Sequence, residues 1–400
     1  MSRSYDLVLM GATGFTGQLV AKHLAREAPE HLRLALAGRS LDKLKMVHAS
    51  MAAGPVKDKC GFIVGDSLNQ KDMERLAEQT VAVISTAGPY AKYGYHLVKA
   101  CVDQNTHYAD LTGEGEFYKH VVSTLHEEAE RNGTRIIPQA GFDSVPSDLA
   151  VYLLAEEYRK NGQELGATRC SVHKLKASMS GGTIASIAGV KPSGPYGYLT
   201  EKERTNIQAV AKPQQSMLSR DPILGGWNSL YVMESIDLPL VFRSAFLNNY
   251  GSKFQWSAYR RTPSLLQAII NNLFILAFAV TSGSSILRPL LSYLMPPGSG
   301  PSEEAQRSGG YSSRTIGSSP DTEVRYVTEL NVNGDPGYSQ TAKILGEVGL
   351  LLALETDKLK SYEGPIPLKQ SGVITASAAF GNVLVDRLKK QGFTFNVSKL

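Results

Sequence analysis

A short glycine-rich segment near the start of the chain limits the fold more than any other feature of the 400 residues. It follows an apolar stretch at 5–10, typical of a buried strand, and opens a helical pattern over 14–26. The first glycine permits a tight turn, the second lets backbone approach a diphosphate, and the third lets helix and strand pack closely. Because the positive end of a helix holds phosphates on its N–H groups, we predict a dinucleotide site. Its residues are Gly11, Ala12, Thr13, Gly14, Phe15, Thr16 and Gly17.

Strands and helices then alternate as far as about residue 150. Short apolar stretches are separated by patterns of helical length, which predicts βαβ units and a parallel sheet. Because crossovers between parallel strands are right-handed, the sheet should carry helices on both faces. We therefore predict a doubly wound Rossmann domain over 1–150, in the α/β class. The predicted strands lie at 5–10, 32–37, 62–64, 81–85, 107–111 and 135–138.

The residues after the second strand indicate which dinucleotide is bound. An NAD enzyme usually places Asp or Glu there to bind the ribose 2′-hydroxyl. This chain has Arg39 and Ser40 instead, with Lys43 one turn further on. A guanidinium forms charge-assisted bidentate bonds with a phosphate, so the pattern favours NADP over NAD. Asp66, after the third strand, is either an acceptor for the adenine amino group or a helix N-cap.

The fourth predicted strand ends in small residues followed by tyrosines. In doubly wound sheets, ligands bind beyond the carboxyl ends of the strands. Small side chains at this place would let the nicotinamide ribose lie against the backbone, with Tyr90 and Tyr93 near the reacting ring. The small residues are Thr86, Ala87, Gly88 and Pro89.

After residue 150 the alternation stops, and we predict a second, α+β domain over 151–364. Strands are expected at 168–178, 253–260 and 323–332, and a helix at 339–354. The segment 296–322 is rich in Pro, Gly and Ser, which predicts a loop or flap. A last helical pattern lies at 372–391, with basic residues in its final turn, where cations suit the helix dipole.

Seven motifs along the chain resemble those of the saccharopine dehydrogenase-like oxidoreductases, and within them the trans-acting enoyl reductase subgroup. The resemblance implies an N-terminal Rossmann domain, a second domain with a mixed sheet, and a C-terminal helix at 365–395 that completes the first domain. It also implies lipid synthesis, because bacterial members reduce enoyl groups on polyketide-derived lipids, and a link to lipid droplets. The motifs lie at 11–17, 37–40, 85–94, 108–114, 141–148, 297–304 and 334–338.

Enoyl reduction needs a hydride on the β-carbon, a hydrogen-bond donor to the thioester oxygen and a proton for the α-carbon. A tyrosine hydroxyl can serve both polar roles, so Tyr90 and Tyr108 are candidate catalytic residues, with Asp110 at a strand end beside them. The alternative for the tyrosines is ordinary packing with a bonded hydroxyl. For Asp110 it is a role in loop geometry.

The apolar segment 264–296 has three interpretations. Gln267, Asn271 and Asn272 interrupt it, which argues against a membrane-spanning helix. The first interpretation is a buried core helix, the second is a surface that contacts a membrane or a lipid acyl chain, and the third is a subunit interface in a homodimer.

Composition and the two chain ends indicate which partners and which cellular compartment to expect. There is no basic cluster with interleaved aromatics, so nucleic acid is not an expected partner, and the eight His lack metal-ligand spacing. The three Cys are far apart in the sequence and do not follow a disulfide pattern, which predicts an intracellular chain with reduced thiols. No signal peptide is recognisable. Ser398, Lys399 and Leu400 match the peroxisomal address, which an import receptor reads on a flexible tail.

Together these features predict a peroxisomal (or glycosomal) NADP-dependent oxidoreductase that reduces an enoyl or carbonyl group of a lipid-like acyl substrate. One alternative is saccharopine-type imine reduction in amino-acid metabolism. Another is a non-catalytic NADPH-binding protein on a lipid surface. A lipid droplet or a membrane is the alternative location.

Overall fold

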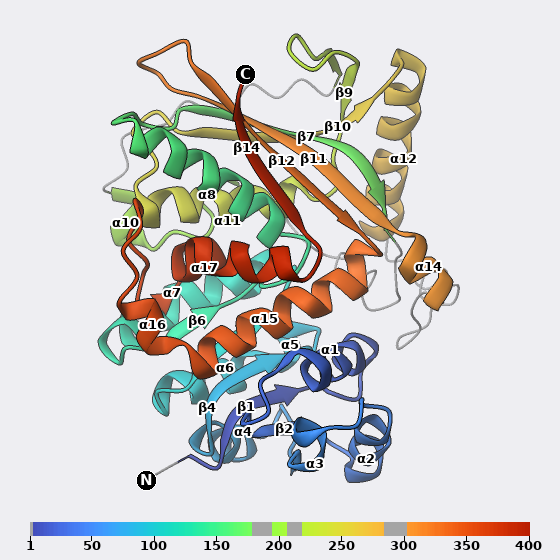
Figure 1. Ribbon diagram of the computed structural model, residues 1–400, viewed down its shortest axis with the longest axis vertical. Coiled ribbons are helices and arrows are strands. Elements are labelled where there is room, and N and C mark those ends of the chain that lie inside the picture. Colours follow the sequence, from blue (N-terminus) through green and yellow to red (C-terminus); the bar gives the residue numbers. More distant parts are fainter. Residues whose placement is uncertain (1–2, 178–193, 206–217, 284–301) are drawn as a thin grey trace. The chain divides into compact units, whose positions relative to one another are not determined.

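The computed structural model describes residues 3–177, 194–205, 218–283 and 302–400 (Figure 1). The chain divides into two compact units, each built from separate stretches of sequence. Unit 1 contains Met1–Val145, Gly337–Glu363 and Pro367–Leu388. Unit 2 contains Pro146–Pro336, Gly364–Ile366 and Lys389–Leu400.

Unit 1 is built on a parallel sheet of seven strands. The strands of its centre are almost wholly apolar and buried, because helices cover both faces of a doubly wound sheet. In spatial order they are β13 (Gly372–Val373), β6 (Arg135–Ile137), β5 (His107–Asp110), β4 (Thr80–Ser85), β1 (Tyr5–Met10), β2 (Leu34–Gly38) and β3 (Gly61–Val64). The predicted Rossmann fold is confirmed.

Ten helices of the described residues belong to this unit wholly or in most of their length. They are α1 (Phe15–Glu27), α2 (Leu41–Ala49), α3 (Pro55–Asp58), α4 (Gln70–Glu78), α5 (Tyr90–Tyr93), α6 (Tyr95–Asp103), α7 (Gly115–Arg131), α15 (Thr341–Leu354), α16 (Thr356–Lys360) and α17 (Ala376–Lys390). The order of strands reverses between β1 and β4, which both pair with parallel neighbours. Ligands bind at such a switch point in doubly wound sheets.

The division between the units differs from the predicted boundaries. Residues 337–363, which we assigned to the second domain, lie in unit 1. The helix α15 is buried on nearly every side and packs on the sheet, where Gly349 lies against Ile84 and Leu7. A helix that is apolar on nearly every side must be buried, and α15 is buried against the unit 1 sheet, although it comes about 200 residues after the last of the strands β1–β6.

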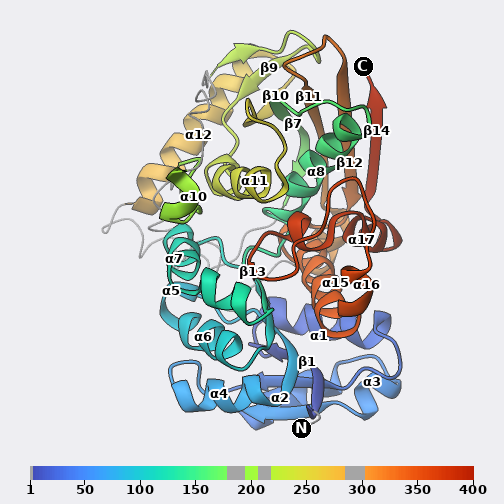
Figure 2. The ribbon, with the colours of Figure 1, turned by 90° about the vertical axis from the view of Figure 1, so that its left-hand side faces the viewer.

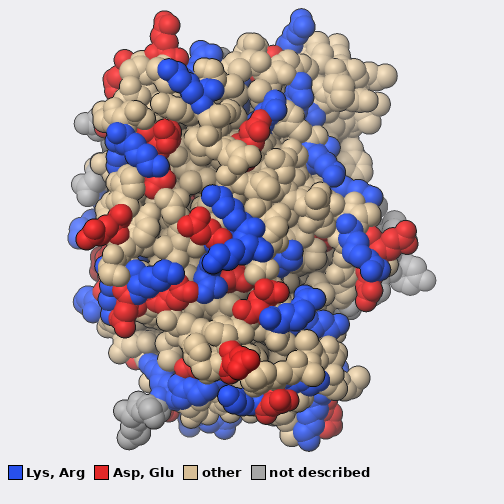
Figure 3. All heavy atoms as spheres, in the orientation of Figure 1, with Lys and Arg blue, Asp and Glu red and all other residues tan. Residues whose placement is uncertain are grey.

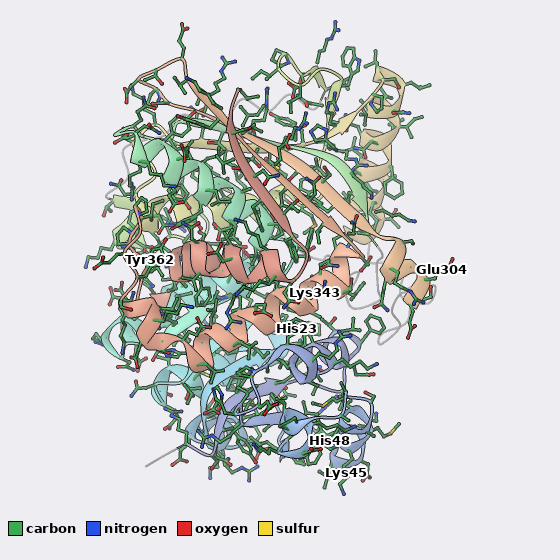
Figure 4. The ribbon with its side chains drawn as sticks, viewed as in Figure 1. His23, Lys45, His48, Glu304, Lys343 and Tyr362 are labelled. Atoms are coloured by element: carbon green, nitrogen blue, oxygen red, sulfur yellow. The ribbon has the colours of Figure 1, made fainter. Side chains whose placement is uncertain are left out.

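A buried ion-pair network joins α15 to α1 and α17. His23 Nε2 lies 3.0 Å from Glu347 Oε1, and Arg387 Nη1 donates to Glu347 Oε2 at 2.6 Å. Arg387 also pairs with Glu355. Burial would raise the pKa of Glu347, but hydrogen bonds from His23 and Arg387 outweigh it and hold that pKa below its usual value. In Figure 4, His23 lies on α1 where that helix meets α15.

Unit 2 is built on a mixed sheet of seven strands, as the family resemblance implied. Only β10 and β7 pair in parallel; the other neighbours are antiparallel. In order the strands are β14 (Thr394–Lys399), β12 (Arg325–Asn333), β11 (Gly310–Ser318), β7 (Ala167–Lys176), β10 (Gln255–Thr262), β9 (Trp227–Ser229) and β8 (Ser219–Arg220). The helices of unit 2 are α8 (Val145–Lys160), α10 (Glu201–Thr205), α11 (Glu234–Asn248), α12 (Leu265–Gly283) and α14 (Glu303–Ser308). The π-helical turn η1 (Pro336–Gln340) belongs to unit 1 from its second residue on.

The prediction of a loop over 296–322 is wrong for most of the residues that the structure describes. Residues 296–301 lie outside the described residues, Glu303–Ser308 form α14 and Gly310–Ser318 form the long strand β11, so that only the end of the segment, 319–322, is a loop. The small residues that suggested a loop allow close packing instead, because a Cβ at Gly317 would lie 2.8 Å from Leu165 and 3.3 Å from Leu154. A glycine in a strand often marks such a close approach.

The C-terminal residues belong to the sheet and do not form a free tail. Ser398 and Lys399 pair with Val327 and Tyr326, and Leu400 N donates to Arg325 O at 2.9 Å. The three side chains are nevertheless exposed. The backbone of the predicted address is therefore hydrogen-bonded, contrary to the flexible tail that we expected.

The helix α12 turns its apolar side outward. Its two asparagines face the sheet: Asn271 Nδ2 donates to Ser229 Oγ and Leu230 O, and Asn272 Oδ1 accepts from Leu230 N. Eight large apolar residues are exposed, so the buried-core interpretation is wrong for 265–283. They are Leu265, Leu266, Ile269, Ile270, Leu273, Phe274, Leu276 and Val280.

The surroundings of α12 carry little charge. In Figure 2 it runs along the β9–β10 side of the sheet, and the surface over it, at the upper right of Figure 3, is almost entirely uncharged. Among the described residues, no helix has the length and apolarity needed to cross a membrane. The outward side of α12 is thus an apolar surface of one helix; residues 284–296 of the predicted segment lie outside the described residues.

Candidate functional site

The glycine segment forms a tight turn at the carboxyl end of β1. Gly11 has a φ of +80° and its N–H donates to Ala37 O. A Cβ at Gly17 would lie 2.3 Å from Gly11 O, which no side chain tolerates. These two glycines therefore have the predicted roles, in the turn and in the packing of α1 on the strand.

The start of α1 leaves space and donors for an anion. Around Gly14, a Cβ would meet only Gly11 O, at 3.4 Å, so the backbone is open on that side. No side chain caps this helix end, and the first N–H groups of a helix have no partners within it. The residues present thus fit a diphosphate, with 11–17 as its cradle and Phe15 and Thr16 supplying the first amides of the helix.

The residues after β2 fit a 2′-phosphate. Arg39 and Lys43 are exposed, and within the described part of the chain neither forms an ion pair. Ser40 Oγ accepts a long hydrogen bond, 3.5 Å, from Lys43 N and so caps α2. Two unpaired cations beside a hydroxyl at this strand end can bind a phosphate on the adenosine ribose.

Asp66 does not cap the helix that follows it. The N-cap of α4 is Asn69, whose side chain accepts from Lys71 N and Asp72 N. Asp66 Oδ1 accepts from Leu68 N at 3.0 Å and shapes the loop after β3. The N-cap interpretation is therefore wrong, and the adenine contact stays a prediction.

The loop after β4 borders the cradle. Thr86 N donates to Met10 O at 2.9 Å, and Thr86 Oγ1 donates to Gly11 O at 3.0 Å. Gly88 and Pro89 are exposed and joined by a cis peptide bond. Thr86 and Ala87 thus lie at the switch point between β1 and β4, where the nicotinamide half was predicted.

The predicted catalytic residues Tyr90, Tyr108 and Asp110 form one buried network. Tyr108 Oη donates to Asp110 Oδ2 at 2.9 Å, and Tyr90 Oη donates to Ser85 O and accepts from Leu111 N. Burial raises the pKa of both hydroxyls well above the usual value. The hydroxyls are thus bonded as the packing alternative requires, and their catalytic role stays a prediction.

Asp110 is the acceptor that organises this network. Its Oδ1 accepts from Thr112 N at 2.9 Å and from Gln139 N at 3.2 Å. Burial raises its pKa to about 7, although these hydrogen bonds act in the opposite direction. Glu114, nearby, accepts from the N–H groups of Tyr90 and Ala91 and so holds the start of α5. Both carboxyls therefore fix the loops that follow β4 and β5.

A second polar cluster lies in unit 2, and sequence analysis did not identify it. Arg260 on β10 lies near the hydroxyls of Tyr231 and Tyr311 and is partly buried. Its Nη1 is buried and has no hydrogen-bond partner among the described residues. Glu234, at the start of α11, also has a buried oxygen without a partner, and burial raises its pKa to about 7. We call Arg260, Tyr231 and Tyr311 the Arg260 cluster.

Strand alternation separates Arg260 from its neighbour in sequence. Successive side chains of a strand point to opposite faces, and Arg261 donates instead to Gly225 O and Leu224 O, in the loop between β8 and β9. A buried donor without a partner is costly, so the orphaned Nη1 of Arg260 marks a place for an acceptor oxygen. The only sequence signal was the Arg260–Arg261 pair itself.

The pKa of Asp110 gives a prediction for stability. The folded carboxyl holds its proton up to about pH 7, whereas the unfolded one releases it near pH 4. The free energy of unfolding of the wild type should therefore fall as pH rises through this window, and the Asp110 carboxyl should account for up to about 4 kcal/mol of that fall. Asp110→Asn keeps the acceptor oxygen and cannot ionise. Urea unfolding should show the variant gaining stability relative to wild type between pH 4.5 and 8.

Asp42→Asn, an exposed change on α2, is the control and should follow the wild-type pH profile. Parallel profiles for wild type and Asp110→Asn would contradict the assignment. Turnover measured on the same variant tests the catalytic prediction separately, since a purely structural Asp110 leaves kcat within a few-fold of wild type.

The comparisons with known proteins agree with this geometry. Residues 7–137 match the family model of the saccharopine dehydrogenase NADP binding domain. Trans-acting enoyl reductases are similar over the full chain: one from Mycobacterium ulcerans is 32% identical over 426 residues, covering 100% of this chain and 99% of that protein. One from Mycobacterium tuberculosis is 33% identical over 434 residues, with the same coverage.

Among solved structures, the apo saccharopine dehydrogenase (L-Glu forming) from Saccharomyces cerevisiae has the same fold. Its TM-score is 0.56 at 12% identity, and the match covers 98% of this chain and 99% of that one. The matched NADP-binding model spans the cradle and Arg39, so the bound dinucleotide is NADP(H). The chain belongs to the trans-acting enoyl reductases of the saccharopine dehydrogenase-like family, and it is an NADP-dependent oxidoreductase.

Proposed function

We propose that this protein reduces the carbon–carbon double bond of an enoyl group in a lipid-type acyl thioester. The cradle at 11–17, with Arg39 and Lys43 beside it, is the observation that carries the redox part of the proposal. The relatives that are named trans-acting enoyl reductases support the enoyl group. NADPH, when bound, supplies the hydride that attacks the β-carbon.

The polar steps of the reaction need a hydrogen-bond donor and a proton beside the bound cofactor. When hydride adds to the β-carbon, the electrons of the double bond move toward the thioester carbonyl and leave an enolate, which a hydrogen-bond donor stabilises. Tyr90 and Tyr108 are our candidates, because they belong to the unit that holds the cradle and lie after β4 and on β5, next to the switch point of the sheet. A tyrosine hydroxyl can also deliver the proton to the α-carbon.

The outward side of α12 supports a lipid partner. It carries no charged residue, and its asparagines are used in bonds to Ser229 and Leu230. A protein–protein interface is normally rimmed by polar residues, whereas acyl chains offer no hydrogen bonds. We propose that α12 contacts the acyl chains of a lipid surface from which the substrate is taken.

The reaction is tested by NADPH oxidation with enoyl, ketone and imine substrates in parallel. We expect turnover with medium- or long-chain enoyl thioesters. Tyr90→Phe and Tyr108→Phe each remove one hydroxyl, and the variant that loses the oxyanion donor should show a kcat about 100-fold lower, with a smaller change in KM. Tyr362→Phe, whose hydroxyl accepts from Asn382 Nδ2 in the same unit, is the control and should keep kcat. Turnover of imines alone would indicate saccharopine-type chemistry, and NADPH binding without any turnover would indicate a non-catalytic protein.

Lipid contact is tested by flotation with phosphatidylcholine vesicles. The wild type should float, and Ile270→Glu with Phe274→Glu should abolish flotation, because both side chains are more than half exposed on α12. Met46→Glu replaces a side chain that is 71% exposed on α2 and should leave flotation unchanged. If the wild type does not float and is a dimer in light scattering, and the double variant is a monomer, α12 is a subunit interface instead.

We propose peroxisomal (or glycosomal) import through Ser398, Lys399 and Leu400. The exposed side chains support recognition, but the receptor must release Leu400 N from Arg325 O and open the end of β14. In cells, N-terminally tagged protein should coincide with a peroxisomal marker, and Leu400→Asp should disperse it. Asn396→Asp, an exposed change on the same strand, should still be imported. Unchanged import of Leu400→Asp would refute the address.

A further inference from the structure

A cavity lies on the face of the unit 2 sheet that carries Arg261, opposite to the face of the Arg260 cluster. Its volume is about 470 Å³, within the range of pockets that bind small molecules. The floor is formed by β7, β10 and β11, where Arg169 pairs with Ser257 on one side and Ile316 on the other. One wall is the loop after β8, with Pro222 and Ile223.

One buried carboxylate positions both the wall and a cation. Asp221 is 2% exposed, and its Oδ1 accepts from the N–H groups of Ile223 and Leu224 at 2.9 Å. The same oxygen lies 3.3 Å from Arg169 Nη2. The guanidinium of Arg169 is therefore held at the cavity with about a quarter of its side chain exposed. Side chains fixed before binding lose less entropy when a ligand arrives.

A second guanidinium reaches the same cavity without a partner. Arg325 begins β12, is exposed, and pairs with Ser318 two residues along β11 from Ile316. Within the described residues its side chain forms no ion pair. Arg325 and Arg169 stand two strands apart, about 10 Å across the sheet, a span that two long side chains can close around one anion.

The rest of the lining is polar without negative charge, or apolar. No Asp or Glu is among the residues that line the cavity. Ser257 and Gln255 offer hydrogen bonds, while Ile223, Ile316 and Tyr259 supply an apolar surface. Two guanidiniums facing a cavity without acids favour an oxyanion, since Arg binds carboxylate and phosphate in bidentate fashion.

We propose that this cavity is a binding site for a small amphipathic molecule whose carboxylate or phosphate group lies between Arg169 and Arg325. Its apolar body packs against Ile223, Ile316 and Tyr259. This site is separate from the NADP(H) cradle, which lies in unit 1, and from the Arg260 cluster, and it does not depend on the reduction proposed above.

The test is calorimetric titration of the full chain with NADPH present at saturation, so that the cofactor site cannot take up the probe. The probes are octyl phosphate, octanoate, 1-octanol and inorganic phosphate. One octyl phosphate or octanoate should bind per chain, and at least tenfold more tightly than 1-octanol. The anion that binds more tightly identifies the head group. If inorganic phosphate binds as tightly as octyl phosphate, the proposed packing of an apolar body in the cavity is refuted.

Arg325→Gln should weaken anion binding at least tenfold without affecting the fold, because this side chain has no partner to lose. Arg314→Gln is the matched control: it lies on the same sheet face, pairs with Glu329 at 2.7 Å and does not line the cavity. Ala167→Trp should fill the cavity and abolish binding. Equal affinity for octyl phosphate and 1-octanol, or wild-type affinity in Arg325→Gln, would overturn the proposal.

Discussion

The close contact between Gly11 and Gly17 is the constraint on which the cofactor site depends. A side chain at Gly17 would overlap Gly11 O, so α1 could not begin beside the end of β1. With both glycines in place, the uncapped start of α1 lies at the switch point of the sheet, next to Thr86 in the loop after β4. The site for a diphosphate thus follows from backbone packing and needs no charged side chain.

Unit 1 is completed by residues that are more than 300 positions away in sequence. The contact of His23 with Glu347 joins the first helix to α15, and Arg387 adds α17. Removing one partner from a buried ion pair leaves a charge unpaired, which costs far more than an exposed pair contributes. This network therefore specifies which late helices cover the sheet of the first unit, a choice that apolar pattern alone leaves open.

The unit 2 sheet separates its functions by strand alternation. Arg260 and Arg261 are neighbours in the chain, yet one joins a buried cluster and the other holds the loop that forms a cavity wall on the opposite side. In unit 1, by contrast, the hydroxyls of Tyr90 and Tyr108 have hydrogen-bond partners, whereas Arg260 Nη1 has none among the described residues.

Local pattern in the sequence was enough to determine the Rossmann domain, the roles of Gly11 and Gly17, and the preference for NADP that Arg39 carries. These features depend on residues close together in the chain, where strand and helix periods and turn geometry act directly. Tertiary structure alone decided that β11 is a central strand, that α15 belongs to unit 1, and that Leu400 is held in a sheet. It also decided that α12 exposes its apolar side and that Arg260 Nη1 has no acceptor among the described residues. The physical reason is that burial and hydrogen-bond pairing are settled between segments far apart in sequence, so no local pattern records them.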